Sequence, residues 1–105
     1  MNILYMVDIS IEAGHMELDD LRDLWEKEVA AARGAMESGL VKSLYKVVGQ
    51  RRVVGILEAD DHDMLDRIAV AGLPMANYLV FNSITPLREY ESFGQDVDDR
   101  WSALG

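Results

Sequence analysis

The chain has no cysteine, only two prolines and few basic residues. Without cysteine there is no disulfide, no thiol nucleophile and no thiolate metal site, which fits a reducing cytosol. Ten Lys and Arg stand against 19 Asp and Glu, giving a net charge of −9. That balance argues against nucleic acid and against an anionic membrane surface as partners. No apolar run approaches the length of a membrane span, and no basic, apolar leader opens the chain, so a cytoplasmic protein is expected.

The length and the hydrophobic content of the chain together predict a single folded domain. Its 105 residues are half hydrophobic, which is too apolar for a disordered chain of this charge, so one folded domain is expected. Strand patterns at residues 3–9, 40–48, 51–59 and 78–84 alternate with two helical patterns. The resulting order, strand–helix–strand–strand–helix–strand, predicts an α+β fold. It is the ferredoxin-like βαββαβ sandwich, with a four-stranded antiparallel sheet and both helices on one face.

The two helical segments have clear starts and stops. Apolar residues recur at three and four residues from position 17 to 38, and Gly39 follows as a helix-terminating residue. Trp25 falls on this apolar stripe and is predicted to lie in the core. Asp60 or Asp61 is expected to cap the second helix, which ends at Gly72. A domain over residues 1–86 is therefore predicted, with Pro86 ending its last strand. An acidic tail follows over 87–105, and its aromatic residues suggest that it docks on a neighbouring subunit.

The hairpin strands around Gly49 carry unusual residues. Alternation along 40–48 predicts Tyr45 on the helix side and Lys46 on the bare side of the sheet. Lys46 is either an edge-strand lysine that blocks aggregation or a cation that points into a pocket. Gly55 lies within an otherwise apolar central strand, where it makes room for a ligand or a neighbouring chain. An exposed apolar sheet face is rare in a monomer, so a homo-oligomer formed through the sheet face or its edges is expected.

Several segments resemble one family when their order and spacing are taken together. Residues 27–30, Lys-Glu-Val-Ala, precede a helix end and strand at 37–49, Glu-Ser-Gly-Leu-Val-Lys-Ser-Leu-Tyr-Lys-Val-Val-Gly. The stretch 72–78, Gly-Leu-Pro-Met-Ala-Asn-Tyr, follows the second helix, and 84–87 and 5–9 match strand segments. These features resemble the muconolactone Δ-isomerase family over about residues 3–88. The resemblance implies a ferredoxin-like fold, a large homo-oligomer and a cofactor-free proton shift in an unsaturated lactone.

The chain departs from the family pattern at polar positions. Tyr45 and Lys46 stand where the family usually has Trp and Arg, and Asp8 stands where it usually has a cation. Val53 replaces a common Asn, and Gln50 replaces a basic residue. The resemblance therefore implies a retained scaffold on which the groups facing the ligand have been exchanged.

Asp8 and Lys46 are the predicted catalytic pair. If the strands over 3–9 and 40–48 both border residues 51–59, the two side chains share the bare face. Asp8 would then act as general base, and Lys46 would stabilise a carboxylate or an enolate. The alternative is an Asp–Lys salt bridge at a subunit interface. Predicted substrate contacts come from the strands and from the first helix: Met6, Leu44, Tyr45, Arg52, Tyr78 and Glu28. His15 and His62 are expected at the surface, and no metal-ligand spacing is recognisable.

Three functions remain open from the sequence. The leading hypothesis is a cofactor-independent, isomerase-like enzyme that moves protons in a small carbonyl-containing cyclic or aromatic metabolite, by isomerisation, cyclisation or dehydration. The second is a cofactor-free monooxygenase on the same fold, which oxygen consumption would reveal. The third is a non-catalytic small-molecule-binding or assembly module.

Overall fold

A computed structural model describes residues 2–101 of the chain. The elements follow one another in this order: β1 Ile3–Ile11, α1 Leu18–Ser38, β2 Val41–Lys46, β3 Arg52–Ala59, α2 His62–Ala71, the 3₁₀ helix η1 Ala76–Tyr78, β4 Leu79–Leu87 and α3 Tyr90–Asp98. The strands form one antiparallel sheet in the order β2-β3-β1-β4. This is the ferredoxin-like arrangement, so the predicted fold class is confirmed.

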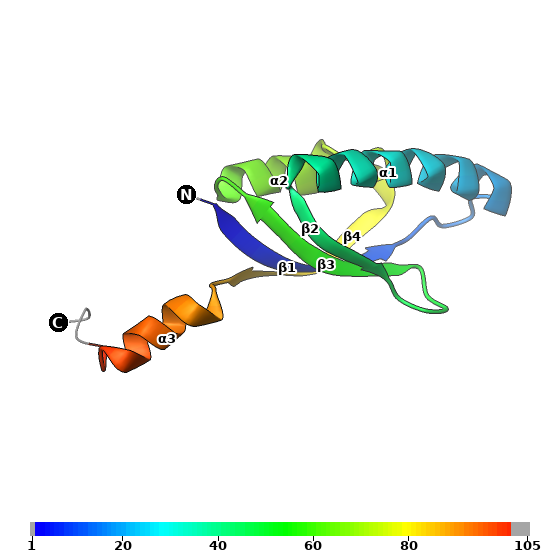
Figure 1. Cartoon of the computed structure of the whole chain (residues 1–105). Coiled ribbons are helices and arrows are strands. Elements are labelled where there is room, and N and C mark those ends of the chain that lie inside the picture. Colours follow the sequence, from blue (N-terminus) through cyan, green and yellow to red (C-terminus); the bar gives the residue numbers. More distant parts are fainter. Residues whose placement is uncertain (1, 102–105) are drawn as a thin grey trace.

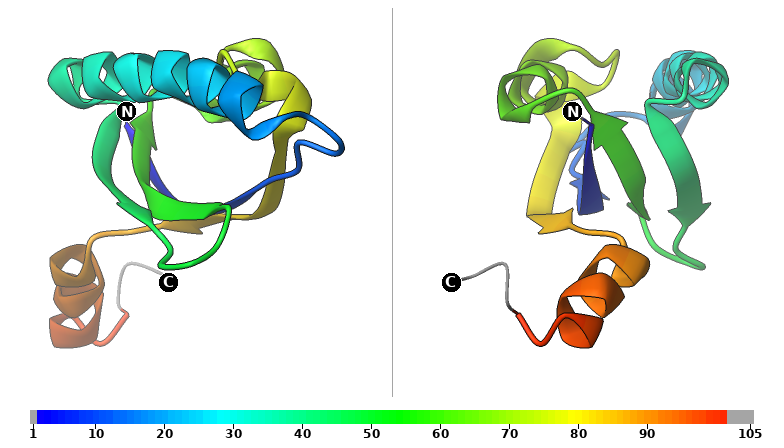
Figure 2. Two further views of the ribbon diagram at one scale, coloured as in Figure 1. Left: turned by 90° about the vertical axis from the view of Figure 1, so that its right-hand side faces the viewer. Right: turned by 60° about the vertical axis from the view of Figure 1, so that its left-hand side comes forward.

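Both α1 and α2 lie on one face of the sheet, and the other face carries no helix layer (Figures 1 and 2). The covered face holds the core, in which Tyr5, Val7 and Ile9 of β1 are buried together with Leu57 of β3 and Leu65 of α2. Alternation along β1 sends these odd-numbered residues towards the helices. The even-numbered residues of β1 therefore point to the bare face.

The start of α2 and the end of α1 are fixed by residues that satisfy or terminate the backbone hydrogen bonding of the helix. The Asp61 carboxylate accepts a hydrogen bond of 2.8 Å from the backbone N–H of Met64 and so caps α2. Gly39 ends α1 in a left-handed conformation with φ of 87°, which a glycine adopts without strain. The Tyr5 hydroxyl is 2.6 Å from Nδ1 of His62, a contact that ties the first turn of α2 to the centre of the sheet.

A bulge in β2 changes which side chains meet the helices. Val41 pairs with Leu57, but the next paired residue is Ser43, so the regular pairing skips Lys42. One extra residue reverses the alternation of every side chain that follows it. Leu44 and Lys46 therefore point to the helix side, and Tyr45 points to the bare side with 65% of its surface exposed. The predicted placement of Tyr45 and Lys46 was wrong for this reason.

The bulge in β2 requires a glycine at position 55 of the neighbouring strand β3. A Cβ at position 55 would collide with the Ser43 carbonyl oxygen and would lie 2.9 Å from Cδ1 of Leu44. The room expected at Gly55 for a ligand or a neighbouring chain is therefore taken by β2 itself. The close approach of the two backbones requires a residue without a side chain.

The C-terminal part of the chain extends away from the sandwich. Pro86 does not end β4, which continues to Leu87, because β4 is an edge strand and tolerates a residue without an N–H. Beyond it, α3 lies on the side of the sheet opposite to α1 and α2 (Figures 1 and 2). The molecule measures 57 × 25 × 20 Å as a result. Within residues 2–101 no helix combines the length and apolar character that crossing a membrane requires.

Candidate active site

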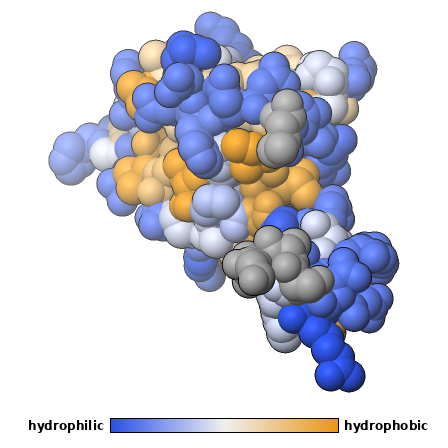
Figure 3. Space-filling model, turned by 90° about the vertical axis from the view of Figure 1, so that its left-hand side faces the viewer, coloured by the Kyte–Doolittle hydropathy of each residue, from blue (hydrophilic) through white to orange (hydrophobic). Residues whose placement is uncertain are grey.

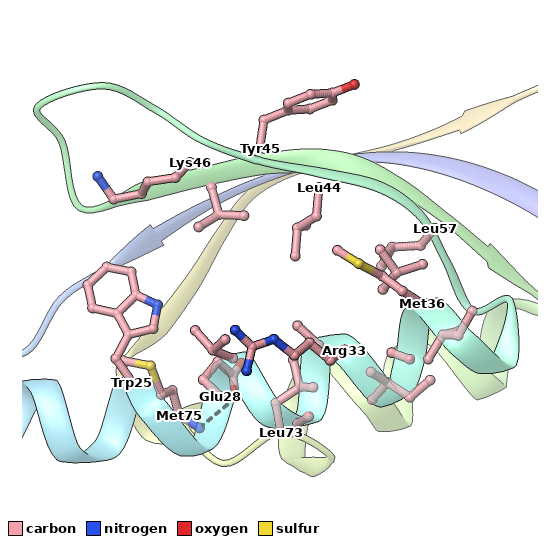
Figure 4. Close-up of a pocket in the computed structure, with 18 of the residues that line it drawn as sticks. Trp25, Glu28, Arg33, Met36, Leu44, Tyr45, Lys46, Leu57, Leu73 and Met75 are labelled. Atoms are coloured by element: carbon pink, nitrogen blue, oxygen red, sulfur yellow. Dashed lines mark hydrogen bonds between the residues drawn. The ribbon is translucent and has the colours of Figure 1, made fainter.

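A pocket of about 620 Å³ lies between α1 and the β2–β3 half of the sheet. Most of its wall is apolar and comes from α1, from β2 and β3, and from the loop after α2 (Figure 4). The residues that matter most for its chemistry are Trp25, Glu28, Arg33, Met36, Lys46 and Met75. The hollow expected on the bare face is therefore found on the helix-covered side of the sheet.

Glu28 is the carboxylate in the wall of this pocket. It lies on α1 between Trp25 and Ala32, and its neighbour across the pocket floor is Met75, which is fully buried. Oε2 of Glu28 accepts a long hydrogen bond of 3.4 Å from the backbone N–H of Met75 (Figure 4). Desolvation raises the pKa of Glu28, and the Met75 N–H opposes this shift only in part. A carboxylate in this setting accepts a proton more readily than an ordinary exposed glutamate does.

Two cations border the same pocket. Arg33 reaches into it from α1, one turn beyond Glu28, while Lys46 approaches from the opposite wall on β2 (Figure 4). The Lys46 ammonium donates a hydrogen bond of 2.9 Å to the carbonyl of Val47, at the edge of the pocket. Among residues 2–101 neither cation forms a salt bridge. Both are therefore available to a negative charge on a bound molecule.

Asp8 lies on the bare face, as predicted, but its partner is Arg52 and not Lys46. The Arg52 Nε donates a hydrogen bond of 2.7 Å to Oδ1 of Asp8, and a second guanidinium nitrogen bonds Oδ2. Asn82 adds a hydrogen bond of 3.3 Å to the same carboxylate. These partners, Arg52 foremost, hold the pKa of Asp8 below its usual range although partial burial acts in the opposite direction. A carboxylate held in this way is a poor proton acceptor.

The remaining predicted contacts divide between the two faces. Leu44 and Glu28 line the pocket, whereas Met6 and Arg52 occupy the bare face. Tyr45 borders the pocket through β2, but its ring points away from it (Figure 4). Tyr78 ends η1 and is not among the pocket residues. The structure thus separates the predicted Asp8–Lys46 pair onto opposite faces of the sheet.

Arg33 and Met75 were missed in the sequence. Arg33 lies four residues after Val29 and eight after Trp25, so a charged side chain stands within the apolar stripe of α1. A charged residue at this spacing indicates a cation on the face of α1 that points to the sheet, so Arg33 could have been found from the sequence. Met75 gave no such signal, because its burial depends on how the loop after α2 folds against the middle of α1. No group of three or more residues able to hold a metal ion occurs in the part of the chain that the structure describes.

Comparison with known proteins agrees with this geometry. The sequence profile described as muconolactone delta-isomerase matches residues 3–93, from β1 into α3. The chain belongs to the muconolactone delta-isomerase family. A Muconolactone Delta-isomerase of Cupriavidus pinatubonensis (strain JMP 134 / LMG 1197) is similar to it, with 30% identity over 91 residues. The aligned part covers 86% of this chain and 97% of that protein.

Membership in this family supports an isomerase function at the level of the family. The resemblance found in the sequence is therefore confirmed. Its most useful segment is 27–30, because this segment contains Glu28, the carboxylate that the structure places in the pocket.

Proposed function

We propose that this protein is a cofactor-independent isomerase that shifts a proton within a small, cyclic, carbonyl-containing compound, with muconolactone as the first substrate to test. The observation that carries this proposal is the Glu28 carboxyl group, whose pKa is raised in the wall of an apolar pocket. A pocket of about 620 Å³ suits a small ring compound. The similarity to a Muconolactone Delta-isomerase supports the choice of substrate.

In the proposed reaction Glu28 first accepts a proton from the carbon next to the substrate carbonyl or its conjugated double bond. The electron pair of the broken C–H bond moves into an enolate, whose negative charge is spread onto the carbonyl oxygen. The neutral Glu28 then returns the proton to a different carbon, so the double bond shifts and no atom is gained or lost. Because one carboxyl group serves both steps, its pKa must lie close to the working pH, which the desolvated site favours.

Arg33 and Lys46 supply positive charge to this reaction in the proposal. An enolate that forms in a mostly apolar pocket is stabilised by fixed cations more strongly than it would be in water. Their positions on opposite walls also suit a substrate that carries an anionic group on one side and its reacting carbon on the other (Figure 4). Lys46 thus keeps the role predicted from the sequence, while Glu28 takes the role predicted for Asp8.

We also propose that the working protein is a homo-oligomer. The bare face exposes Met6 with 47% of its surface accessible, next to the partly exposed Val54 and Ile56 of β3. Such an apolar centre favours burial against a second sheet. The ion pairs Asp8–Arg52 and Lys42–Glu58 lie on this same face and would contribute specificity to that contact.

The proposal is tested by following proton exchange in deuterated buffer. Wild-type protein should convert muconolactone, and NMR should detect deuterium on the carbon that gains the proton in the fraction of turnovers in which the Glu28 carboxyl exchanges its proton with the solvent. Glu28→Gln keeps the shape and the hydrogen bond to Met75 but cannot accept a proton, so turnover should fall by about 10²–10⁴-fold.

Glu26→Gln is the matched control, because Glu26 is an exposed carboxylate on the same helix. It should leave turnover and exchange unchanged. Equal activity of Glu28→Gln and the wild type would contradict the assignment of Glu28. Absence of any conversion of muconolactone and related lactones by the wild type would contradict the isomerase proposal itself.

A further inference from the structure

The pocket beside α1 is larger than the reaction at Glu28 requires. Its volume is about 620 Å³. A dry apolar cavity of about 150 Å³ is enough to hold one benzene ring. A single small ring that reacts at Glu28 therefore fills only about a quarter of the pocket. The rest of the volume is open to another part of the ligand.

Charged side chains occupy one half of this pocket, and apolar side chains occupy the other (Figure 4). The first half contains the Trp25 ring and the charged groups of Glu28 and Lys46, whereas Met36 and Leu57 lie in the second half. The strand register explains this division. Lys46 ends β2, while Leu57 pairs with the first residue of that strand, so the two lie at opposite ends of the pocket.

The second half is hollow because α1 presents small side chains to it. Ala31, Ala32 and Ala35 follow Glu28 by three, four and seven residues, a spacing that puts all four on one helix face. Leu44 lines the opposite wall. Ala35 lies about 10 Å beyond Glu28 along the helix axis. A ring held at Glu28 thus has an apolar space of about that length beside it.

The charges determine which way a ligand lies in the pocket. Arg33 and Lys46 form no salt bridge within residues 2–101, so they attract an anionic group towards the half that contains Glu28. The lining of the second half is uncharged, and we call it the apolar subsite: Ala35, Met36, Leu40, Val41, Leu44 and Leu57. An apolar group on the same ligand gains most by entering this subsite.

The apolar subsite differs from the apolar surface on the outside of the molecule. Figure 3 shows hydrophobic residues gathered on the body above the largely hydrophilic helix α3. Exposed apolar surface of that kind is typical of a contact with another protein. The subsite lies instead between a helix and a sheet, and Val41 and Leu57 are buried in its wall. A concave apolar site of this size is typical of a small-molecule ligand.

We propose that the substrate is a cyclic carbonyl compound that carries an apolar alkyl or aryl substituent in addition to its anionic group. The ring and the anionic group lie between Glu28, Arg33 and Lys46, and the substituent extends along α1 past Ala35 to Leu57. The position of the ring rests on the proposed isomerase function, whereas the apolar subsite rests on the volume and polarity of the pocket alone. A single-ring lactone such as muconolactone leaves this subsite empty.

Binding of unreactive ligands tests the proposal without turnover. The probes are saturated lactones with one carboxylate, either unsubstituted or with straight alkyl chains of increasing length, and titration calorimetry measures their Kd. Each added CH₂ should lower Kd about three- to fourfold until the chain reaches the end of the subsite. Equal Kd values along the series would overturn the proposal, because another part of the protein, such as a second copy, would then fill this space.

An aryl-substituted probe with the same number of carbon atoms identifies the kind of substituent. Tighter binding than that of the alkyl probe would assign the subsite to an aromatic ring, and weaker binding would assign it to a chain. Either result supports an apolar subsite as long as both probes bind more tightly than the unsubstituted lactone.

One substitution tests the location of the substituent. Ala35→Leu fills the apolar subsite, so the Kd ratio between the unsubstituted and the longest alkyl probe should fall by about tenfold. Ala30→Leu is the matched control, since Ala30 is exposed on the same helix and does not line the pocket. It should leave this ratio unchanged. A ratio that survives in a folded Ala35→Leu protein would place the substituent elsewhere.

A second measurement needs no variant. NMR of the wild type with the longest alkyl probe should show nuclear Overhauser effects between the chain and the methyl groups of Leu44 and Leu57. Effects to the methyl group of Met6 instead would place the probe on the bare sheet face and overturn the proposal.

The two proposals fail in different ways. Conversion of muconolactone without any gain in affinity from a substituent would refute the apolar subsite and leave the isomerase function intact. Graded binding of the alkyl probes without conversion of any lactone would refute the isomerase function and leave the subsite intact.

Discussion

Glu28 on the covered side of the sheet and Asp8 on its bare side are both partly buried carboxylates, and the two groups have opposite properties. On the covered face, Glu28 stands in an apolar wall and has a single long hydrogen bond, so its pKa is raised. On the bare face, Asp8 is held by Arg52 and Asn82, so its pKa is lowered. Burial alone therefore does not mark a proton-transfer residue. The partners decide whether a buried carboxylate stays charged as part of the structure or remains able to exchange a proton.

The largest expected effect is a difference in turnover between substitutions of Glu28 and of Asp8. Glu28→Gln should reduce kcat by about 10²–10⁴-fold, while Asp8→Asn should leave kcat close to that of the wild type. In the wild type, kcat/KM should rise with pH through a pKa above that of an ordinary glutamate, because only the charged form accepts a proton. Steady-state kinetics across the pH range measures both. Loss of turnover in Asp8→Asn with an intact fold would restore Asp8 as the base.

The next effect concerns the glycine under the bulge. Gly55→Ala should destabilise the protein by roughly 1–3 kcal/mol, because the new methyl group forces β2 away from β3. Thermal unfolding should show it as a lower Tm. Gly34→Ala is the control, since a Cβ at that exposed position of α1 meets no atom within 4 Å. It should stabilise the helix by about 0.5–1 kcal/mol. Equal effects of the two substitutions would show that the bulge does not need Gly55.

A smaller effect compares neighbouring residues of β2 that face opposite sides. Lys46→Met removes a cation from the pocket and should weaken the binding of an anionic lactone by about 1 kcal/mol or less, because the ammonium is partly solvated. Tyr45→Ser changes the bare face and should leave this affinity unchanged. Titration calorimetry with a substrate analogue measures both. The reverse result would mean that β2 pairs in solution without the bulge.

The smallest effect is a difference in the pH dependence of stability. The folded state favours neutral Glu28, so its charge costs stability as pH rises above the ordinary value of 4.5. Glu28→Gln should therefore be more stable than the wild type at neutral pH, and this gain should vanish in acid. The folded state favours charged Asp8, so Asp8→Asn should be less stable at neutral pH, and its deficit should shrink as pH falls below 3.8.

Urea midpoints measured at neutral and at acid pH provide this comparison. Two variants that shift in the same direction would contradict the opposite pKa shifts of the two carboxylates.

Much of the fold could be predicted from the sequence, because each helix and strand shows its hydrophobic period within its own short stretch of residues. The period of 3.6 in 17–38 and the strand patterns on either side of it predicted the element order correctly. The Asp61 cap and the Gly39 stop lie close to their predicted positions. The helix in the tail was not predicted, since its apolar stripe of Tyr90, Phe93 and Val97 within an acidic segment is too short to stand out.

The site was only partly accessible, because two features that decide it are not local. Strict alternation assigned Lys46 to the bare face, and the skipped residue Lys42 reversed this assignment. The burial of Glu28 depends on the loop that brings Met75 against α1, which no pattern around residue 28 reveals. Glu28 was included among the substrate contacts, yet its acid–base character emerges only from its surroundings in three dimensions.

The missing side chain at Gly55 has an effect beyond packing. A hydrogen atom in place of a side chain at that Cα lets β2 pair with an extra residue, and β2 then presents the amine of Lys46 instead of the phenol of Tyr45 to a ligand in the pocket. Ligand preference in this scaffold can thus be altered by a methyl group that no ligand ever touches.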